Sequence, residues 1–203
     1  MKISILDYGA CNISSVYSAF KNLGEEAKVI NSLNDIKNSE KIIIPGVGAA
    51  KSSLDYLKSN NLFEPLKTFI SSGKPTLGIC LGLQMFSKTL YENGKSEGLG
   101  YLNADVINFP DNKNIFHIGW NSVEIKEKYQ KMFRLKKECS FYFCHSYFVD
   151  LQDKTECIAG STKFNIEFPS IIINDNLMGV QFHPEKSQSN GVKILETFID
   201  WNP

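Results

Sequence analysis

Cys80 lies in the part of this chain that is best suited to covalent chemistry. Glycines stand two residues before and two residues after it, at Gly78 and Gly82. The preceding apolar run predicts a short strand, and the following residues predict the start of a helix. Small residues at this spacing permit a sharp turn that exposes the sulfur at the strand end. Because a helix N-terminus favours thiolate over thiol, we expect Cys80 to be a nucleophile for a carbonyl carbon.

A nucleophilic thiol needs a general base, and the chain contains three histidines. His183 ends an apolar run, Pro184 terminates that run, and Glu185 stands two residues after the imidazole. A carboxylate at this spacing can fix the imidazole tautomer and leave the second ring nitrogen to face the sulfur. The three residues therefore predict acyl transfer by a cysteine, a histidine and a carboxylate. An inert, buried Cys80 is the alternative.

Three motifs, in this order, resemble the class I (triad-type) glutamine amidotransferases: PGVG at 45–48, GICLGLQ at 78–84 and FHPE at 182–185. Further runs are similar to the glutaminase subunits of imidazole glycerol phosphate synthases. These runs are Asp7-Tyr8-Gly9, Asn12, Ser15-Val16, His117 to Asn121, Tyr142 to Tyr147 and Lys186-Ser187. The resemblance covers essentially the whole chain, and it implies one type 1 glutamine amidotransferase domain at residues 1–203.

The resemblance implies hydrolysis of L-glutamine to glutamate and ammonia. Cys80 would attack the side-chain amide, and His183 would move the thiol proton to the leaving ammonia. Glu185 would orient His183, and water would then cleave the Cys80 thioester. The chemistry needs no cofactor and no metal ion.

A tetrahedral intermediate also needs an oxyanion hole. The backbone N–H of Leu81, directly after the nucleophile, is one expected donor. By resemblance the second donor comes from Val47 and Gly48, where glycine lets a peptide plane reorient at little steric cost. An ordinary strand-to-helix turn is the competing interpretation of this run. The glutamine-binding residues implied by the resemblance are Gly48, Gln84, His145, Ser146 and Tyr147, although Gln84 also suits a polar helix start and His145 a structural role.

Ammonia released by the chain needs an acceptor, and the sequence has no phosphate-binding Gly-x-x-x-x-Gly-Lys-Ser/Thr loop of its own. The resemblance implies a heterodimer with a (β/α)8 cyclase, which uses the ammonia to form imidazole glycerol phosphate and AICAR in histidine biosynthesis. We expect the isolated chain to be nearly inactive. By resemblance, the residues that contact the partner subunit are Asn12, Trp120, Tyr142 and Lys186. Each of them also suits an ordinary surface position.

Two positions depart from the family pattern. Cys11 stands where glycine is usual, near the expected partner surface, and Ala50 stands where phenylalanine is usual. These departures leave open a paralogous subunit that supplies ammonia to surface-sugar biosynthesis. A stand-alone γ-glutamyl hydrolase or cysteine peptidase, and a non-enzymatic scaffold, are the more distant alternatives.

The composition indicates an ordinary soluble globular domain, with 42% hydrophobic residues, 22% charged residues and a formal net charge of zero. The lysines of 126–137 alternate with glutamates and predict a solvated face, so we expect no nucleic-acid or membrane partner. No run is long enough for a membrane helix, and the N-terminus does not suit a signal peptide. Five cysteines without a Cys-x-x-Cys pair favour a reducing cytoplasm over disulfides or zinc.

In the first half of the chain, the strands and helices that must position these residues alternate. We expect a flavodoxin-like α/β fold, with a mostly parallel sheet, helices on both faces and extra antiparallel strands in the second half. The motifs at residues 7–9, 45–48 and 80 then follow strand ends, where such sheets bind ligands. The expected strands are 3–6, 27–30, 41–44, 76–79, 104–108, 115–117, 140–149, 157–162, 170–174 and 177–182, with a hairpin turn at 174–176. The expected helices are 12–23, 49–57, 62–71 and 190–201.

Overall fold

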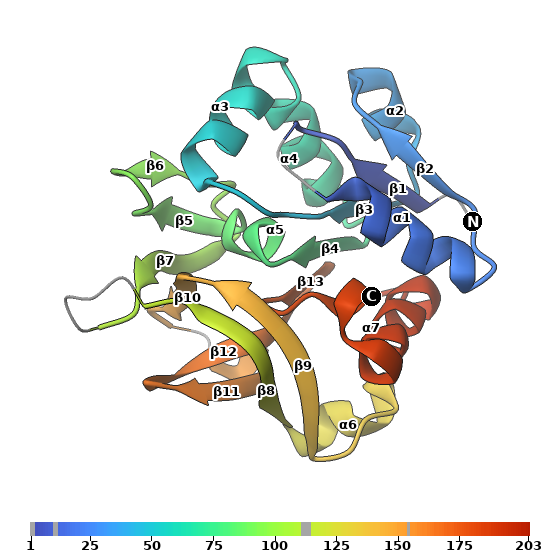
Figure 1. The fold of residues 1–203 in the computed structure, drawn as a ribbon. Helices are drawn as coiled ribbons and strands as arrows, with labels where there is room; N and C mark the ends of the chain where they lie inside the picture. The colour runs from blue at the N-terminus through green and yellow to red at the C-terminus, as the bar shows by residue number, and fades with distance from the viewer. Residues whose placement is uncertain (1–2, 10–11, 111–114, 154) are drawn as a thin grey trace.

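The computed structural model of the chain describes residues 3–9, 12–110, 115–153 and 155–203. These residues form a nine-stranded sheet and a four-stranded sheet. Figure 1 shows helices above and below the parallel strands in the middle of the molecule. Of the two departures from the family pattern, Ala50 begins helix α3 and Cys11 lies outside the described residues.

Parallel pairing builds the first half of the larger sheet, in the order β2-β1-β3-β4-β13. Four of these five strands are buried along their whole length. Largely apolar runs of this kind suit strands that helices cover on both faces. The predicted α/β fold with helices on both faces is therefore confirmed, and the parallel pairing is that of this half of the larger sheet. The strands are β1 (Ile3–Leu6), β2 (Ala27–Ile30), β3 (Lys41–Ile44), β4 (Thr76–Ile79) and β13 (Leu177–Val180).

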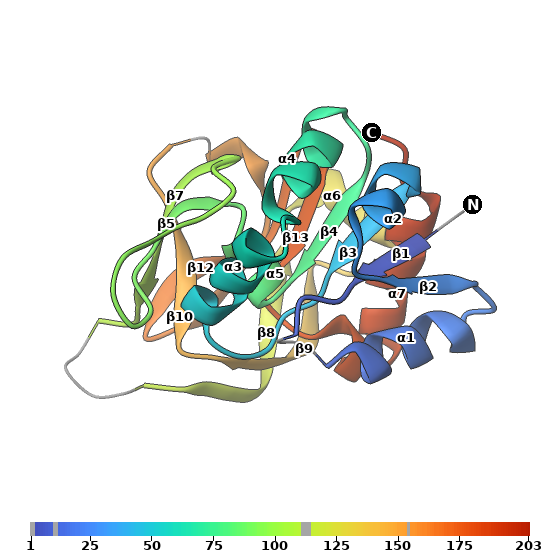
Figure 2. The same cartoon turned by 90° about the horizontal axis from the view of Figure 1, so that it is seen from above.

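Successive side chains of the parallel strands enter two different hydrophobic clusters, because neighbouring residues of a strand point to opposite faces. Ile42 and Ile44 pack with residues of α2, α3 and α4, whereas Ile43 packs with residues of α1 and α7. Seen from above in Figure 2, α2, α3 and α4 lie in front of the strands and α7 lies behind them. The helices are α1 (Ile13–Asn22), α2 (Leu33–Asn38), α3 (Ala50–Ser59), α4 (Phe63–Ser71) and α7 (Gln188–Asp200).

Antiparallel strands complete the larger sheet in the order β13-β12-β11-β8-β9. The predicted hairpin turn is confirmed, because Asn174 pairs with Leu177 and Asp175 adopts a positive φ of 50°. The strands are β8 (His117–Ile125), β9 (Glu138–His145), β11 (Ile158–Phe164) and β12 (Ile166–Asn174), with α6 (Glu127–Phe133) between β8 and β9. The smaller sheet has the order β10-β7-β5-β6 and consists of β5 (Ser87–Leu90), β6 (Ser96–Glu97), β7 (Leu102–Asn108) and β10 (Tyr147–Leu151).

Three sequence-based predictions differ from the structure. The run 140–149 is not one strand, because the chain leaves β9 at Ser146 and enters β10 in the other sheet. The strand predicted at 115–117 begins at His117 and continues to Ile125, and its outer face carries apolar as well as polar residues. The run 126–137 is not only a solvated face, since α6 buries Phe133 in the cluster that also contains residues of β9 and α7.

Candidate active site

The turn between β4 and α5 (Leu81–Gln84) holds Cys80 in a strained conformation, with φ 52° and ψ −104°. Strain of this kind costs about 1–3 kcal/mol and persists only where the surroundings enforce it. A Cβ added to Gly78 would lie 2.6 Å from the Gly82 backbone, and one added to Gly82 would lie 1.9 Å from the Ile44 carbonyl oxygen. The two glycines therefore let α5 pack directly against β3 and β4. This packing fixes the predicted sharp turn at the nucleophile.

His183 and Glu185 form a buried pair beside this turn. His183 Nδ1 donates a hydrogen bond of 2.9 Å to Glu185 Oε1, so the proton of the neutral imidazole lies on Nδ1. The His183 N–H donates to the Tyr142 carbonyl at 2.9 Å, which attaches the segment to β9. Because β13 and β4 are parallel neighbours with Val180 opposite Ile79, the chain that leaves β13 runs close to Cys80. The structure thus brings together the three residues that the sequence predicts.

The second imidazole nitrogen of His183 is available for chemistry. Nε2 is buried and has no hydrogen-bond partner in the described part of the chain. Burial lowers the pKa of His183, but its interactions with Cys80 and Glu185 outweigh burial and raise this pKa from 6.5 to about 10. The imidazole is therefore a strong enough base to hold the thiol proton at neutral pH.

Gln181 is a polar neighbour of the sulfur that the sequence analysis did not single out. Its Nε2 donates to Cys80 Sγ at 3.5 Å, and its Oε1 accepts from Gln84 Nε2 at 3.3 Å. Gln84 also donates to the Tyr147 carbonyl at 2.8 Å, so the predicted substrate residue is held by two internal hydrogen bonds. A glutamine within an otherwise apolar run, two residues before His183, is the sequence signal that could have identified Gln181, which the structure buries completely.

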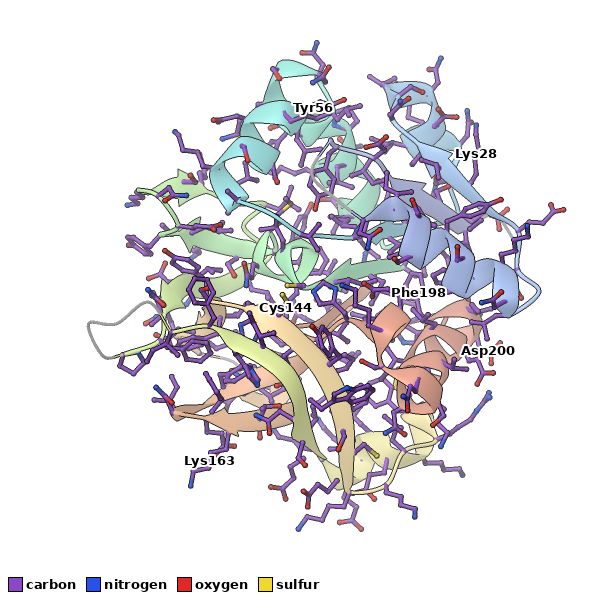
Figure 3. The ribbon with its side chains drawn as sticks, viewed as in Figure 1. Lys28, Tyr56, Cys144, Lys163, Phe198 and Asp200 are labelled. Atoms are coloured by element: carbon purple, nitrogen blue, oxygen red, sulfur yellow. The ribbon has the colours of Figure 1, made fainter. Side chains whose placement is uncertain are left out.

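A cavity of about 420 Å³ opens beside Cys80, a volume suited to a small molecule. The expected oxyanion and substrate residues line it together, namely Val47, Gly48, Leu81, Gln84, His145, Ser146 and Tyr147. Figure 3 shows Cys144 near the centre of the view, and its carbonyl oxygen lies 3.9 Å from the Cys80 sulfur. A larger cleft of about 790 Å³ borders α2 and α4, but it shares no lining residue with this cavity.

The N–H groups expected to bind an oxyanion are unpaired. Within the described residues, the backbone N–H groups of Val47, Gly48 and Leu81 make no hydrogen bond. Gly48 has a φ of 106°, which a larger residue would rarely adopt. Glu92 supplies the only carboxylate among the described lining residues, and its Oε2 accepts from the Ala50 N–H at 2.6 Å. Glu92 follows β5 outside any motif, so the sequence analysis missed it.

His145 belongs to a chain of hydrogen bonds between buried neutral rings. Asn121 Nδ2 donates to His117 Nε2 at 3.1 Å, and His117 Nδ1 lies 3.0 Å from His145 Nε2. His145 Nδ1 in turn donates to the Tyr147 carbonyl at 2.8 Å. Burial lowers the pKa of His117 to about 4 and that of His145 to about 3. His145 lines the cavity and also anchors the segment at 145–147, which matches the structural role weighed from the sequence.

Three apolar side chains stand exposed around the start of β8, and two of them, Phe116 and Ile118, line the cavity. Phe116, Ile118 and Trp120 are 60%, 62% and 50% exposed and alternate along β8 and the residue before it. Trp120 lies against Tyr142 with ring centroids 6.2 Å apart, and Lys186 Nζ lies 5.7 Å from the Tyr142 ring centroid. Exposed apolar patches of this kind mark interaction surfaces. Three of the expected docking residues, Trp120, Tyr142 and Lys186, thus lie together. Asn12 is separate from them in the sequence: it precedes α1, and its side chain makes no capping hydrogen bond to that helix.

The described residues contain no cluster of histidine, cysteine or acidic side chains arranged to hold a metal ion. Within the same residues, no helix is long and apolar enough to span a membrane.

Comparison with known proteins identifies similar sequences over almost the whole chain. The family described as Glutamine amidotransferase class-I matches residues 4–201. The imidazole glycerol phosphate synthase subunit HisH of Caldanaerobacter subterraneus subsp. tengcongensis is 42% identical over 196 residues, or 97% of this chain and 96% of that protein. The subunit of the same name from Sulfurimonas denitrificans is 39% identical over 205 residues, or 98% of each chain.

Solved structures with the same fold have much more distant sequences. A chain of PurLQS from Thermotoga maritima has a TM-score of 0.77 at 17% identity, covering 98% of this chain and 97% of that chain. The glutaminase domain of Trypanosoma brucei CTPS, with bound acivicin, has a TM-score of 0.70 at 16% identity, covering 100% of this chain and 95% of that one.

Proposed function

Because this chain belongs to the class I glutamine amidotransferases, we propose that Cys80, His183 and Glu185 hydrolyse the side-chain amide of L-glutamine. Relatives that are 39–42% identical over nearly their whole length carry the name imidazole glycerol phosphate synthase subunit HisH. The chain is therefore a glutaminase subunit of this type, acting in histidine biosynthesis. The surface-sugar paralogue and the stand-alone hydrolase are not favoured. We take residues 1–203 as one domain.

One observation carries the proposed chemistry: the unpaired, buried Nε2 of an imidazole with a raised pKa, next to the cysteine at a strained turn. Nε2 takes the proton of the Cys80 thiol as the sulfur bonds to the amide carbon of glutamine. The same proton then passes to the leaving nitrogen, which departs as ammonia and leaves a γ-glutamyl thioester. Water, deprotonated by His183, attacks the thioester carbon, and cleavage of the carbon–sulfur bond releases glutamate and restores the thiol.

The oxyanion of each tetrahedral intermediate requires donors that the resting protein leaves unused. We assign this role to the backbone N–H of Leu81, with a second donor from the peptides of Val47 and Gly48. All three N–H groups lack partners within the described residues, and all three residues line the cavity at Cys80. Removal of one such donor typically slows an enzyme by about 10²–10³-fold.

The cavity offers complementary groups for the rest of the glutamine molecule. Glu92 provides negative charge for the α-ammonium group. We assign binding of the α-carboxylate and the chain of the substrate to backbone and hydroxyl groups of the segment at 145–147, with Gln84 and Gly48, all of which line the cavity. Because the amide of Gln84 donates to the Tyr147 carbonyl, Gln84 acts on the substrate partly by holding this segment in place.

The chain works as a subunit of a synthase complex, and we propose that its partner is a (β/α)8 cyclase that receives the ammonia. The surface formed by exposed Phe116, Ile118 and Trp120 and half-buried Tyr142, with Lys186 beside it, is the face proposed to dock. Phe116 and Ile118 also line the cavity at Cys80, so a partner seated there would cover the place where ammonia forms. Asn12 is proposed to contribute from the start of α1.

Glutamate release from glutamine tests this proposal. It is measured with the chain alone, and then with the histidine-pathway cyclase of the same organism and its ribonucleotide ligand. We expect slow release by the chain alone and strong activation in the complex. Full turnover by the chain alone would instead indicate an independent hydrolase. Inactivity under both conditions would overturn the proposed reaction.

A further inference from the structure

Tyr8 is a fully buried tyrosine that connects two strand ends next to the cavity. It follows β1, and its hydroxyl donates a hydrogen bond to the carbonyl oxygen of Pro45, the first residue after β3. β1 and β3 are parallel neighbours, so the bond joins their carboxyl ends. A buried phenol requires a hydrogen-bond partner, and here that partner is the backbone immediately before Gly46, Val47 and Gly48.

The Pro45–Gly46 peptide is also confined from its other side. A Cβ added to Gly46 would lie 2.4 Å from Leu81 Cβ and 2.7 Å from the Gly82 nitrogen, so this backbone touches the turn that carries the nucleophile. The carbonyl of Pro45 and the N–H of Gly46 belong to one rigid plane. A bond to the carbonyl therefore fixes the plane against the turn at Cys80.

A second bond holds the other end of the same segment. Glu92 Oε2 accepts from the N–H of Ala50, the first residue of α3. Between these two attachments, the N–H groups of Val47 and Gly48 have no partner within the described residues. The segment 46–49 is thus fixed at both ends and unbonded at its centre, where an oxyanion donor is required.

We propose that Tyr8 is a positioning residue for the oxyanion hole. Its hydroxyl holds the Pro45–Gly46 plane, so that any reorientation of the segment is limited to the Val47 and Gly48 peptides that face Cys80. This inference rests on the proposed glutaminase function. It assigns to Tyr8 an effect on the tetrahedral intermediate and none on the formation of the Cys80–His183 pair.

The test compares Tyr8→Phe with Tyr101→Phe. The Tyr101 hydroxyl also donates to a backbone carbonyl, that of Lys67 at 2.7 Å, but Tyr101 does not line the cavity at Cys80. In the complex with its cyclase, Tyr8→Phe should lower kcat for glutamine hydrolysis by at least about tenfold, with a smaller change in KM. Tyr101→Phe should leave both constants close to those of the wild type.

Alkylation of Cys80 by iodoacetamide separates positioning from general damage. This displacement develops no oxyanion, so its rate should be the same in wild type and Tyr8→Phe if the hydroxyl acts only on the oxyanion hole. An unchanged kcat in Tyr8→Phe would overturn the proposal, as would equal losses of hydrolysis and alkylation. An inactive wild-type complex would instead remove the proposed function, and the role of Tyr8 with it.

Phenylalanine keeps the buried ring, so we expect the variant to fold. If it does not, site-specific incorporation of 4-fluorophenylalanine at position 8 provides the second test, because the fluorine fills the space of the hydroxyl but donates no hydrogen bond. There kcat should also fall by at least about tenfold. A kcat equal to that of the wild type would overturn the proposal.

Discussion

At the scale of single residues, the chemistry depends on the raised pKa of His183. Glu185 accepts from Nδ1 at 2.9 Å, and both side chains are only 2% exposed, so the carboxylate acts on the imidazolium with little screening by water. Burial opposes this effect and lowers the pKa, but Cys80 and Glu185 together outweigh it. A base that is buried and oriented in this way needs no rearrangement before it takes the thiol proton.

Glu185→Gln should lower the pKa of His183, because it removes one charge and weakens one hydrogen bond that favour the imidazolium. The amide retains the size of the carboxylate but can present its NH2 group to Nδ1 and select the wrong tautomer. We expect kcat to fall by about 10²–10⁴-fold. NMR titration of the His183 ring measures the pKa, and an unchanged titration would contradict this assignment. Glu167→Gln, an exposed position on β12, is the matched control.

At the scale of elements, the site depends on the close approach of α5 to β3. Gly82→Ala should destabilise the protein by at least about 2 kcal/mol, because its Cβ would overlap the Ile44 carbonyl oxygen at 1.9 Å. Gly24→Ala is the control, since no atom lies within 4 Å of its Cβ and only its φ of 79° is unfavourable. That change should cost about 1 kcal/mol. Urea unfolding measures both free energies of unfolding, and a loss in Gly82→Ala no larger than that in Gly24→Ala would contradict the close approach of α5 to β3.

The sequence predicted the first half of the fold closely because its strands are short, apolar and buried on both faces. The prediction of the turn at Cys80 rested on glycines whose absent side chains the structure requires. The division of 140–149 at Ser146 was not predictable, because aromatic residues continue through the break and only the position of the second sheet explains it. Glu92 was missed for a similar reason, since tertiary packing alone brings it to the cavity.

At the scale of the whole molecule, the buried histidines couple stability to pH. His117 and His145 have folded pKa values of about 4 and about 3, below the value of 6.5 expected when unfolded. Between these values the unfolded chain binds more protons, so the stabilising contribution of these two histidines is complete above pH 6.5 and decreases as the pH falls. Each histidine can change the free energy of unfolding by at most about 1.4 kcal/mol per pH unit.

His117→Phe should reduce this dependence between pH 6.5 and 5, where most carboxylates do not yet titrate. Phenylalanine can keep the stacking on Phe143 and Phe164, whose ring centroids lie 4.5 Å and 4.1 Å from that of His117. The variant loses the hydrogen bonds to His145 and Asn121, so its stability at pH 7 should also be lower. Chemical unfolding at several pH values measures the slope, and an unaltered slope would show that His117 is not held neutral by burial.

The central claim is that Cys80 forms a covalent γ-glutamyl thioester within a subunit that releases ammonia to its partner. The most direct measurement is mass spectrometry of the Cys80 peptide after acid quenching of the complex during glutamine turnover. We predict a mass increase of one γ-glutamyl group on Cys80, absent in Cys80→Ala, which should also lose hydrolysis while still binding the cyclase. Turnover without any adduct on this peptide, together with hydrolysis that persists in Cys80→Ala, would contradict the account.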